Sequence, residues 1–531
     1  MAVIESIQQE TSEFDGVHFA QERHPGVVLG LTWEQLAVVA LGVVFALGGI
    51  VLQGRMLIIG IVMLLVCAAV GVIRLQGRSI PEWALLFMRQ LVRQASGQLT
   101  YRQGVEPGHQ LQLVDGEPQA VVLEAGQAAV RDAKGRIKPG APARLRLPGG
   151  ADELRLYGLP GGAGFVWDPR TKEASVCAKV LTTRGFELES FDSQEERSLS
   201  WGGALAAMGR LPGVVRVQAA DQTTLISGSN VLGYYDSKQE GAGIESKTVD
   251  PFLDAAFREL MAEAQAMPVH EQWLTIVLSP ARIGSQLKSL GGGVPALMDH
   301  ALKVMSTVEG LLPRSGTRVA AWHSPRSLAG LSRAAFDPDA ALMVSSTDPS
   351  GAVQGASPNG GGGPMAVEVH AGHMRTDGHM HRTYKVSELP QQLARLGFLD
   401  ELIFAGDFRH TVSVFMSPVD RSSAMRATKR RMATWRSDSK VMERMDRPPS
   451  PEHEQEKDDI EREQGELMKR HAGLEMAVLV TVTGRNESEL EAASNEIMTS
   501  SITAGCELRP LYLEQDSAFM AAALPFGMVK L

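Results

Sequence analysis

The stretch GAGIESKT, residues 241–248, differs at one position from the phosphate-binding loop G-x-x-x-x-G-K-[ST]. Gly241, Lys247 and Thr248 stand where the motif requires them, and Ser246 replaces its second glycine. Such a loop binds phosphate because its backbone N–H groups are held between a buried strand and the start of a helix. No strand is predicted to precede this stretch, which lies in the polar run DSKQEGAGIESKTVDP. We therefore expect a solvated connection and no cofactor, with a nucleotide sensor as an alternative.

A group of histidines forms the second candidate site. The segment 365–386, MAVEVHAGHMRTDGHMHRTYKV, is predicted to be a β-hairpin because Asp377 and Gly378 favour a type I′ turn. Alternation along a strand would put side chains two positions apart on one face. Clustered imidazoles bind transition metals, so this hairpin offers candidate metal ligands. The histidines in it are His370, His373, His379 and His381, of which the last three are the candidate ligands.

The same hairpin permits a nuclease interpretation. His-Met-His, residues 379–381, matches the metal motif of relaxase-type endonucleases, and Tyr384 is close by as a nucleophile. A membrane-tethered, metal-dependent nuclease is therefore the alternative function. However, Tyr384 is three positions from His381 and is expected to project to the opposite face of the strand. The simpler interpretation is a set of polar residues on the exposed face of an edge hairpin, with no catalytic residue and no metal.

Composition limits the classes of protein that the chain can represent. Its 531 residues allow roughly three to four domains at ~100–200 residues each. The net charge of -9 argues against general nucleic-acid coating, since phosphate-backbone binding relies on clustered lysine and arginine. Cys67, Cys177 and Cys506 are far apart and form no C-x-x-C pair, so neither a disulfide framework nor a thiolate metal site is expected.

Two uncharged apolar runs lie near the N-terminus, at residues 36–52 and 56–73. At ~1.5 Å per residue each covers about 25–27 Å, close to the ~30 Å hydrocarbon core once flanking residues such as Trp33 are added. We therefore expect a two-helix transmembrane hairpin. Arginines are more frequent after the second run than in the turn between the runs, so the positive-inside rule predicts that both ends of the hairpin lie on the cytoplasmic side. The expected location is the cytoplasmic (inner) membrane. Both termini and the bulk of the chain would then be cytoplasmic.

An amphipathic helix is expected directly after these runs, over PEWALLFMRQLVRQASG at 81–97. We expect it to lie on the membrane surface or to dock on a partner, and a plain packed helix is the alternative. Its candidate interaction residues are Trp83, Phe87, Arg89 and Arg93.

Farther along the chain, strand and helix patterns alternate in the manner of α+β sandwiches. The expected fold class is α+β, with an N-terminal transmembrane helical hairpin followed by several small α/β-sandwich (ferredoxin-like) modules and a projecting charged helical hairpin. The predicted units are a cytoplasmic segment 1–35, the transmembrane hairpin 36–73, a juxtamembrane helix 74–100, a first module 101–245, a second module 246–344, a flexible Gly/Ser/Pro-rich linker 345–364 and a last module 365–531.

The charged helical hairpin is predicted within residues 419–473. Strand patterns flank it on both sides, and PPSP at 448–451 separates a basic arm from an acidic arm. This pattern is consistent with two interpretations. One is a solvated surface, on which each exposed ion pair contributes ~0.2–1 kcal/mol to stability. The other is a projecting hairpin that docks a partner. Direct nucleic-acid binding is not expected, because the acidic arm cancels much of the field. The candidate docking residues on the basic arm are Arg430, Arg431, Arg436 and Lys440.

Two parts of the sequence resemble components of type IV secretion and conjugation systems. The apolar runs followed by GRSIPEWALLFMRQL resemble the small PrgI-like inner-membrane subunits. A series of segments between Tyr384 and Gly527 resembles, in matching order, the N-terminal domain of the type IV secretion ATPase. These segments are YKVSELP, GFLDELIF, HTVSVFMSPVDRSSAM, the charged hairpin, MAVLVTVTG and FMAAALPFG. The whole arrangement is similar to actinobacterial conjugation-associated membrane proteins that fuse both pieces.

This resemblance implies a docking component without a motor. In the ATPase a motor domain with a phosphate loop follows, whereas this sequence ends at Leu531 and contains no complete phosphate loop. We therefore expect a non-enzymatic inner-membrane scaffold of a type IV secretion-like transfer apparatus. Its expected partners are the membrane, a separate transfer ATPase with an intact phosphate loop, other channel subunits and further copies of the chain.

Overall fold

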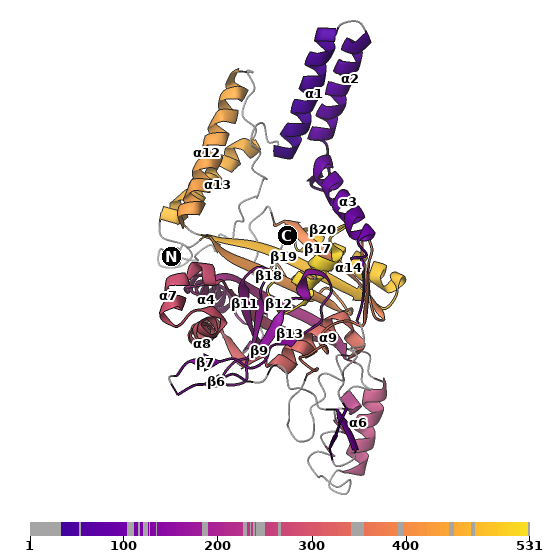
Figure 1. Cartoon of the computed structure of the whole chain (residues 1–531), viewed down its shortest axis with the longest axis vertical. Helices are drawn as coiled ribbons and strands as arrows, with labels where there is room; N and C mark the ends of the chain where they lie inside the picture. The colour runs from indigo at the N-terminus through magenta and orange to yellow at the C-terminus, as the bar shows by residue number, and fades with distance from the viewer. Residues whose placement is uncertain are drawn as a thin grey trace, which may run out of the picture.

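The protein is built around one large antiparallel sheet, from which two pairs of helices project (Figure 1). Its computed structural model describes residues 33–528 except 53–54, 104–110, 115–116, 121–125, 127, 134, 183–188, 227–230, 234, 237–238, 240–249, 264–266, 341–354, 391–396, 420, 445–450 and 469–472. The predicted segment 1–35 therefore lies almost wholly outside the described residues.

The first pair consists of α1 (Trp33–Leu52) and α2 (Arg55–Val72), which pack side by side (Figure 1). Glycines allow this close approach: a Cβ added at Gly42 would lie 2.7 Å from the Cβ of Cys67, and one at Gly60 would lie 2.8 Å from the carbonyl oxygen of Phe45.

No helix within the described residues is long and apolar enough to cross a membrane. Glu34 and Gln35 occupy the first turn of α1, and Arg55 begins α2. The uncharged parts of the two helices, 36–52 and 56–72, therefore each rise about 25 Å, which is shorter than the ~30 Å hydrocarbon core. This finding overturns the prediction of a two-span transmembrane hairpin and of a two-span inner-membrane localisation.

The next helix, α3 (Ile80–Ala95), begins at a complete capping box. The hydroxyl of Ser79 accepts a hydrogen bond from the backbone N–H of Glu82, and the Glu82 carboxylate accepts one from the N–H of Ser79. Pro81 lies in the first turn, where its missing N–H costs nothing. A short ribbon of β1 (Arg74–Leu75) and β2 (Arg78–Ser79) connects α2 to this helix.

The large sheet has 14 strands in the order β3-β15-β16-β17-β19-β18-β12-β13-β11-β10-β9-β8, with β14 beside β11 and β20 beside β17. Its strands are β3 (Thr100–Arg102), β8 (Ala143–Arg144), β9 (Arg155–Gly158), β10 (Gly164–Asp168), β11 (Glu173–Thr182), β12 (Val214–Ile226), β13 (Met267–Leu278), β14 (Thr317–Trp322), β15 (Ala366–Val369), β16 (Met374–Thr376), β17 (His379–Glu388), β18 (His410–Val419), β19 (Gly473–Gly484) and β20 (Glu507–Pro510). Two small ribbons stand apart, β4 (Leu111–Val114) with β5 (Glu117–Ala120) and β6 (Val130–Arg131) with β7 (Ile137–Lys138).

Two halves of this sheet share one connectivity, β-α-β-β-α-β. In the first half, α4 (Phe191–Gly209) and α8 (Gly293–Leu311) connect strands in the spatial order β12-β13-β11-β14. In the second half, α11 (Asp400–Ile403) and α14 (Glu487–Thr503) connect β18-β19-β17-β20. The halves join through their second strands, β12 and β18, in antiparallel register with Ala219 opposite Val414. Pairing of these edges buries backbone groups that each half alone would expose.

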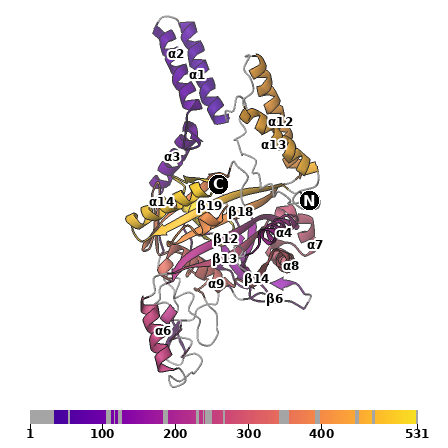
Figure 2. The same cartoon turned by 180° about the vertical axis from the view of Figure 1, so that it is seen from behind.

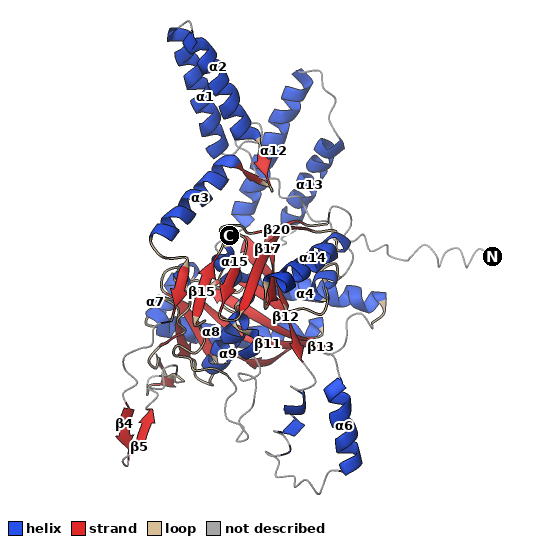
Figure 3. Cartoon of the chain, turned by 90° about the vertical axis from the view of Figure 1, so that its right-hand side faces the viewer, coloured by secondary structure: helices blue, strands red, loops and turns tan. Residues whose placement is uncertain are grey.

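Helices cover both faces of the sheet (Figure 3). On one face, α4 and α8 bury Met208 and Leu297 against β11–β13, and α14 buries Ile497 against β17–β19. On the other face, α9 (Pro325–Phe336) and α15 (Gln515–Ala523) bury Phe336 and Phe519. The remaining described α-helices are α6 (Pro251–Glu263), α7 (Gly284–Ser289), α12 (Arg421–Arg444) and α13 (Pro451–Met468).

Each half carries an insertion between its second and third strands. In the first half, α6 lies between β12 and β13, and in the second half α12 and α13 lie between β18 and β19. The insertions project from opposite ends of the sheet, and α12 and α13 point to the same end as α1 and α2 (Figures 1 and 2). The projecting arms are therefore additions to a repeated framework.

The structure corrects the predicted fold class to a mixed α/β fold with one large antiparallel sheet and no supported transmembrane hairpin. Each of the predicted modules 101–245, 246–344 and 365–531 contributes strands to that sheet. The described end of the predicted flexible linker, residues 355–364, packs closely: a Cβ at Gly363 would lie 2.0 Å from the carbonyl oxygen of Arg146. Residues 341–354 of the chain lie outside the described part.

Candidate functional site

The helical hairpin formed by α12 and α13 projects from the sheet (Figure 1). A cluster of contacts around Trp435 joins its arms. The Trp435 ring stacks on the His453 ring with centroids 4.8 Å apart, and its Nε1 donates to the His453 carbonyl at 2.8 Å. The Ser439 hydroxyl lies 2.7 Å from Nε2 of the same histidine. The two arms therefore have a fixed register even though most of their surface is polar.

Basic side chains cover the side of α12 that faces away from Trp435. Arg430, Arg436 and Lys440 are exposed, whereas Arg431 is half-buried. At 3.6 residues per turn the three exposed residues lie on the half of the helix opposite Trp435, and so opposite α13. Three of the four predicted docking residues on this arm are thus presented to solvent together.

The helix α3 uses two of its predicted interaction residues within the chain. Arg93 pairs with Asp516 of α15, and Trp83 Nε1 donates to the Leu75 carbonyl at 3.0 Å. Phe87 and Arg89, in contrast, are exposed. The sequence offered no signal for the Arg93 pair, because its partner lies 423 residues away.

The histidines of the β16–β17 hairpin separate into two places. His370 and His373 stack on each other with centroids 4.5 Å apart, outside the paired strands. His381 is fully buried and lies 2.6 Å from the Thr376 hydroxyl and 2.9 Å from the Thr483 hydroxyl. The side chains of His379 and His381 are thus buried, not on an exposed edge as expected. The turn also differs from type I′, since Asp377 has a positive φ of 42° and Gly378 does not.

The nuclease arrangement does not form. Tyr384 is 1% exposed and packs in the core under α14, whereas His381 contacts Phe519 of α15 on the other face of the sheet. The hydroxyl of Tyr384 therefore has no access to a substrate held near these histidines. Burial also lowers the pKa of His381 to about 3, which keeps its ring neutral.

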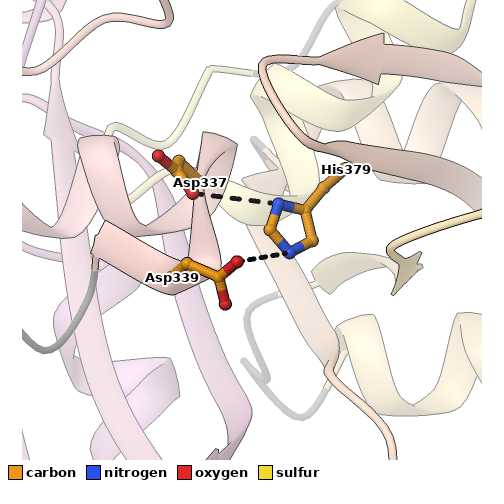
Figure 4. A group of neighbouring side chains, drawn as sticks. All are labelled: Asp337, Asp339 and His379. Atoms are coloured by element: carbon orange, nitrogen blue, oxygen red, sulfur yellow. Dashed lines mark ion pairs between the residues drawn. The ribbon is translucent and has the colours of Figure 1, made fainter.

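His379 takes part in a different group, which the sequence did not suggest. Asp337 at the end of α9 and Asp339 in the short helix Pro338–Ala340 both direct carboxylates toward its ring nitrogens (Figure 4). Nδ1 lies 3.8 Å from Asp337 Oδ1, and Nε2 lies 3.8 Å from Asp339 Oδ2. These three residues can hold a cation. The aspartates lie 42 and 40 residues before His379 (379 − 337 and 379 − 339), which explains why spacing alone did not reveal the group.

The near-phosphate loop, Gly241 to Thr248, lies outside the described residues. No family model matches the chain, and no curated protein is significantly similar to it in sequence.

Proposed function

We propose that the protein is a non-enzymatic scaffold of a type IV secretion-like transfer apparatus, and that it docks a separate ATPase through the α12–α13 hairpin. The observation that carries this proposal is the hairpin itself. It projects from paired strands β18 and β19, its register is fixed by Trp435 and His453, and it presents Arg430, Arg436 and Lys440 on one side. A rigid charged arm suits a partner with a complementary acidic surface, because such surfaces steer association and fix orientation.

Two further observations support a docking role. The resemblance to the N-terminal domain of the transfer ATPase includes the strands on both sides of this hairpin, and the sequence contains no complete phosphate loop. The second insertion, α6, also exposes apolar side chains at the other end of the sheet, with Phe252 77% and Leu253 63% exposed. A protein with an arm at each end can contact two neighbours in an assembly.

Charge reversal on the arm tests the proposal. The full chain and the triple variant Arg430→Glu, Arg436→Glu and Lys440→Glu would be tested for co-purification with a transfer ATPase that has an intact phosphate loop and comes from the same genome. The matched control is the triple variant Arg136→Glu, Lys288→Glu and Arg314→Glu, which changes net charge equally at exposed sites on the sheet domain. We expect binding by the wild type and the control, and loss of binding by the arm variant. Equal binding by all three chains, or no binding of such an ATPase by the wild type, contradicts the proposal.

A further inference from the structure

The group Asp337, Asp339 and His379 connects the two halves of the sheet. Asp337 and Asp339 follow α9, which comes after the last strand of the first half, and His379 begins β17 of the second half. A ligand held by all three residues would therefore link the halves at a second point, in addition to their β12–β18 junction.

The imidazole lacks a partner that its burial requires. His379 is only 4% exposed, and its Nδ1 has no hydrogen-bond partner among the described residues. Both 3.8 Å separations from the carboxylates are too long for hydrogen bonds, which lie near 2.7–3.2 Å. Buried polar atoms are nearly always satisfied, and an unsatisfied one often marks a bound water or ion.

Neighbouring arginines orient the carboxylates and leave one oxygen of each toward the histidine. Arg333 donates to Oδ2 of Asp337 at 2.8 Å, and Arg485 donates to Oδ1 of Asp339 at 3.2 Å. The remaining oxygens, Oδ1 of Asp337 and Oδ2 of Asp339, face the ring (Figure 4). Hydrogen bonds of this kind hold metal ligands in place in many sites.

We propose that Asp337, Asp339 and one ring nitrogen of His379 bind a divalent transition metal, with Zn²⁺ as the best match. One imidazole with two carboxylates is a donor set that zinc accepts, at metal–ligand distances of about 2.0–2.2 Å. In a tetrahedral site the ligand atoms lie about 3.4 Å apart, but each 3.8 Å separation involves a different ring nitrogen. A metal on one nitrogen therefore requires the carboxylate that faces the other nitrogen to move toward it. One ligand atom from each residue lies within 4.8 Å of the other two, and the Asp339 side chain is 64% exposed, so its movement displaces solvent and lengthens only its 3.2 Å contact with Arg485. Water would complete the coordination.

Zinc titration of the full chain tests this site. After EDTA treatment and dialysis, metal content would be measured by mass spectrometry, and Tm would be followed as ZnCl₂ is added. A ligand that binds only the folded chain raises Tm, and at a given concentration it does so more the more tightly it binds. We expect about one zinc per chain and a rise in Tm for the wild type. The variants Asp339→Asn and His379→Gln should bind zinc at least about tenfold more weakly.

Matched variants make the result decisive. Asp407→Asn, an exposed aspartate outside the site, should keep the wild-type zinc response. Asp339→Asn alters an exposed side chain, so its folding is not at risk even if the buried His379→Gln variant unfolds. Absence of zinc binding by the wild type, a full zinc response in Asp339→Asn, or stabilisation by MgCl₂ but not by ZnCl₂ would each overturn the proposal.

Discussion

Arg93 of α3 pairs with Asp516 at the start of α15, so a helix near the N-terminus is bound to one near the C-terminus. Arg78 and Glu514 form a second ion pair between the same regions at 2.7 Å. The Asp516 side chain is 9% exposed and that of Arg93 is 18% exposed, so both charges are largely removed from water. Such pairs stabilise little when intact and cost most when one partner is removed.

Replacing Arg93 by alanine should therefore destabilise the fold. The change leaves the Asp516 carboxylate buried without its cation, and we expect a loss of about 1–3 kcal/mol, below the ~3–5 kcal/mol typical of fully buried pairs because some solvent reaches Arg93. Urea unfolding measures this loss. Arg89→Ala, one turn away and exposed, should change stability by less than ~0.5 kcal/mol. Equal effects of the two substitutions would show that the ion pair contributes nothing.

The Trp435–His453 contact should determine whether the two arms of the hairpin stay together. Trp435→Ala removes a ring stack and a hydrogen bond of 2.8 Å, and the sheet core lies elsewhere. We expect limited proteolysis to cut α12 and α13 at least several times faster than in the wild type, because cleavage follows local opening. The midpoint of global unfolding should change little. Unchanged protease resistance would mean that other contacts join the arms.

Local features of this fold were predictable from the sequence, and long-range ones were not. Pro81 signalled the start of α3, and the strand patterns on either side of PPSP located β18 and β19. The β12–β18 junction was not predictable, because it is made by backbone hydrogen bonds between edges that carry no pairing code.

The side-chain sites show the same difference between predictable local features and unpredictable long-range ones. The alternation of β17 correctly put His379 and His381 on one face and Tyr384 on the other. The approach of Asp337 to His379 depends on how α9 packs under the sheet, which no spacing rule contains. The apolar runs at 36–52 and 56–73 were read as membrane spans from the length of their uncharged stretches; the helices α1 and α2 do form there, but neither is long and apolar enough to cross a membrane.

Gly363 offers a test of the packed end of the predicted linker. A Cβ at this position would lie 2.0 Å from the carbonyl oxygen of Arg146, and backbone cannot move aside as a flexible side chain can. We expect Gly363→Ala to lower the free energy of unfolding by about 3 kcal/mol or more. Gly310→Ala is the matched control: this exposed glycine of α8 has nothing within 4 Å of an added Cβ, so the change should stabilise by ~0.5 kcal/mol. Similar, small effects at both positions would indicate that residues 355–364 are loosely held.

His323 should make stability depend on pH. It is 8% exposed, and burial lowers its pKa to about 4; Glu271 and Lys179 act more weakly, with opposite signs. In the unfolded chain the pKa is near 6.5, so between pH 6.5 and 4 the unfolded state binds more protons than the folded state. The stabilisation is thus fully present above pH 6.5 and is lost as pH falls toward 4.

The expected loss from His323 alone is about 2 kcal/mol between pH 7.5 and pH 5. Urea unfolding at both values would measure it in the wild type and in His323→Asn, which can still reach the Ser327 hydroxyl that now lies 2.7 Å from Nδ1. Other buried histidines, including His381, contribute to the slope of both proteins, so the difference between the slopes isolates His323. We expect the variant to lose less stability on acidification. Identical slopes would mean that His323 becomes protonated in the folded protein as readily as in the unfolded chain.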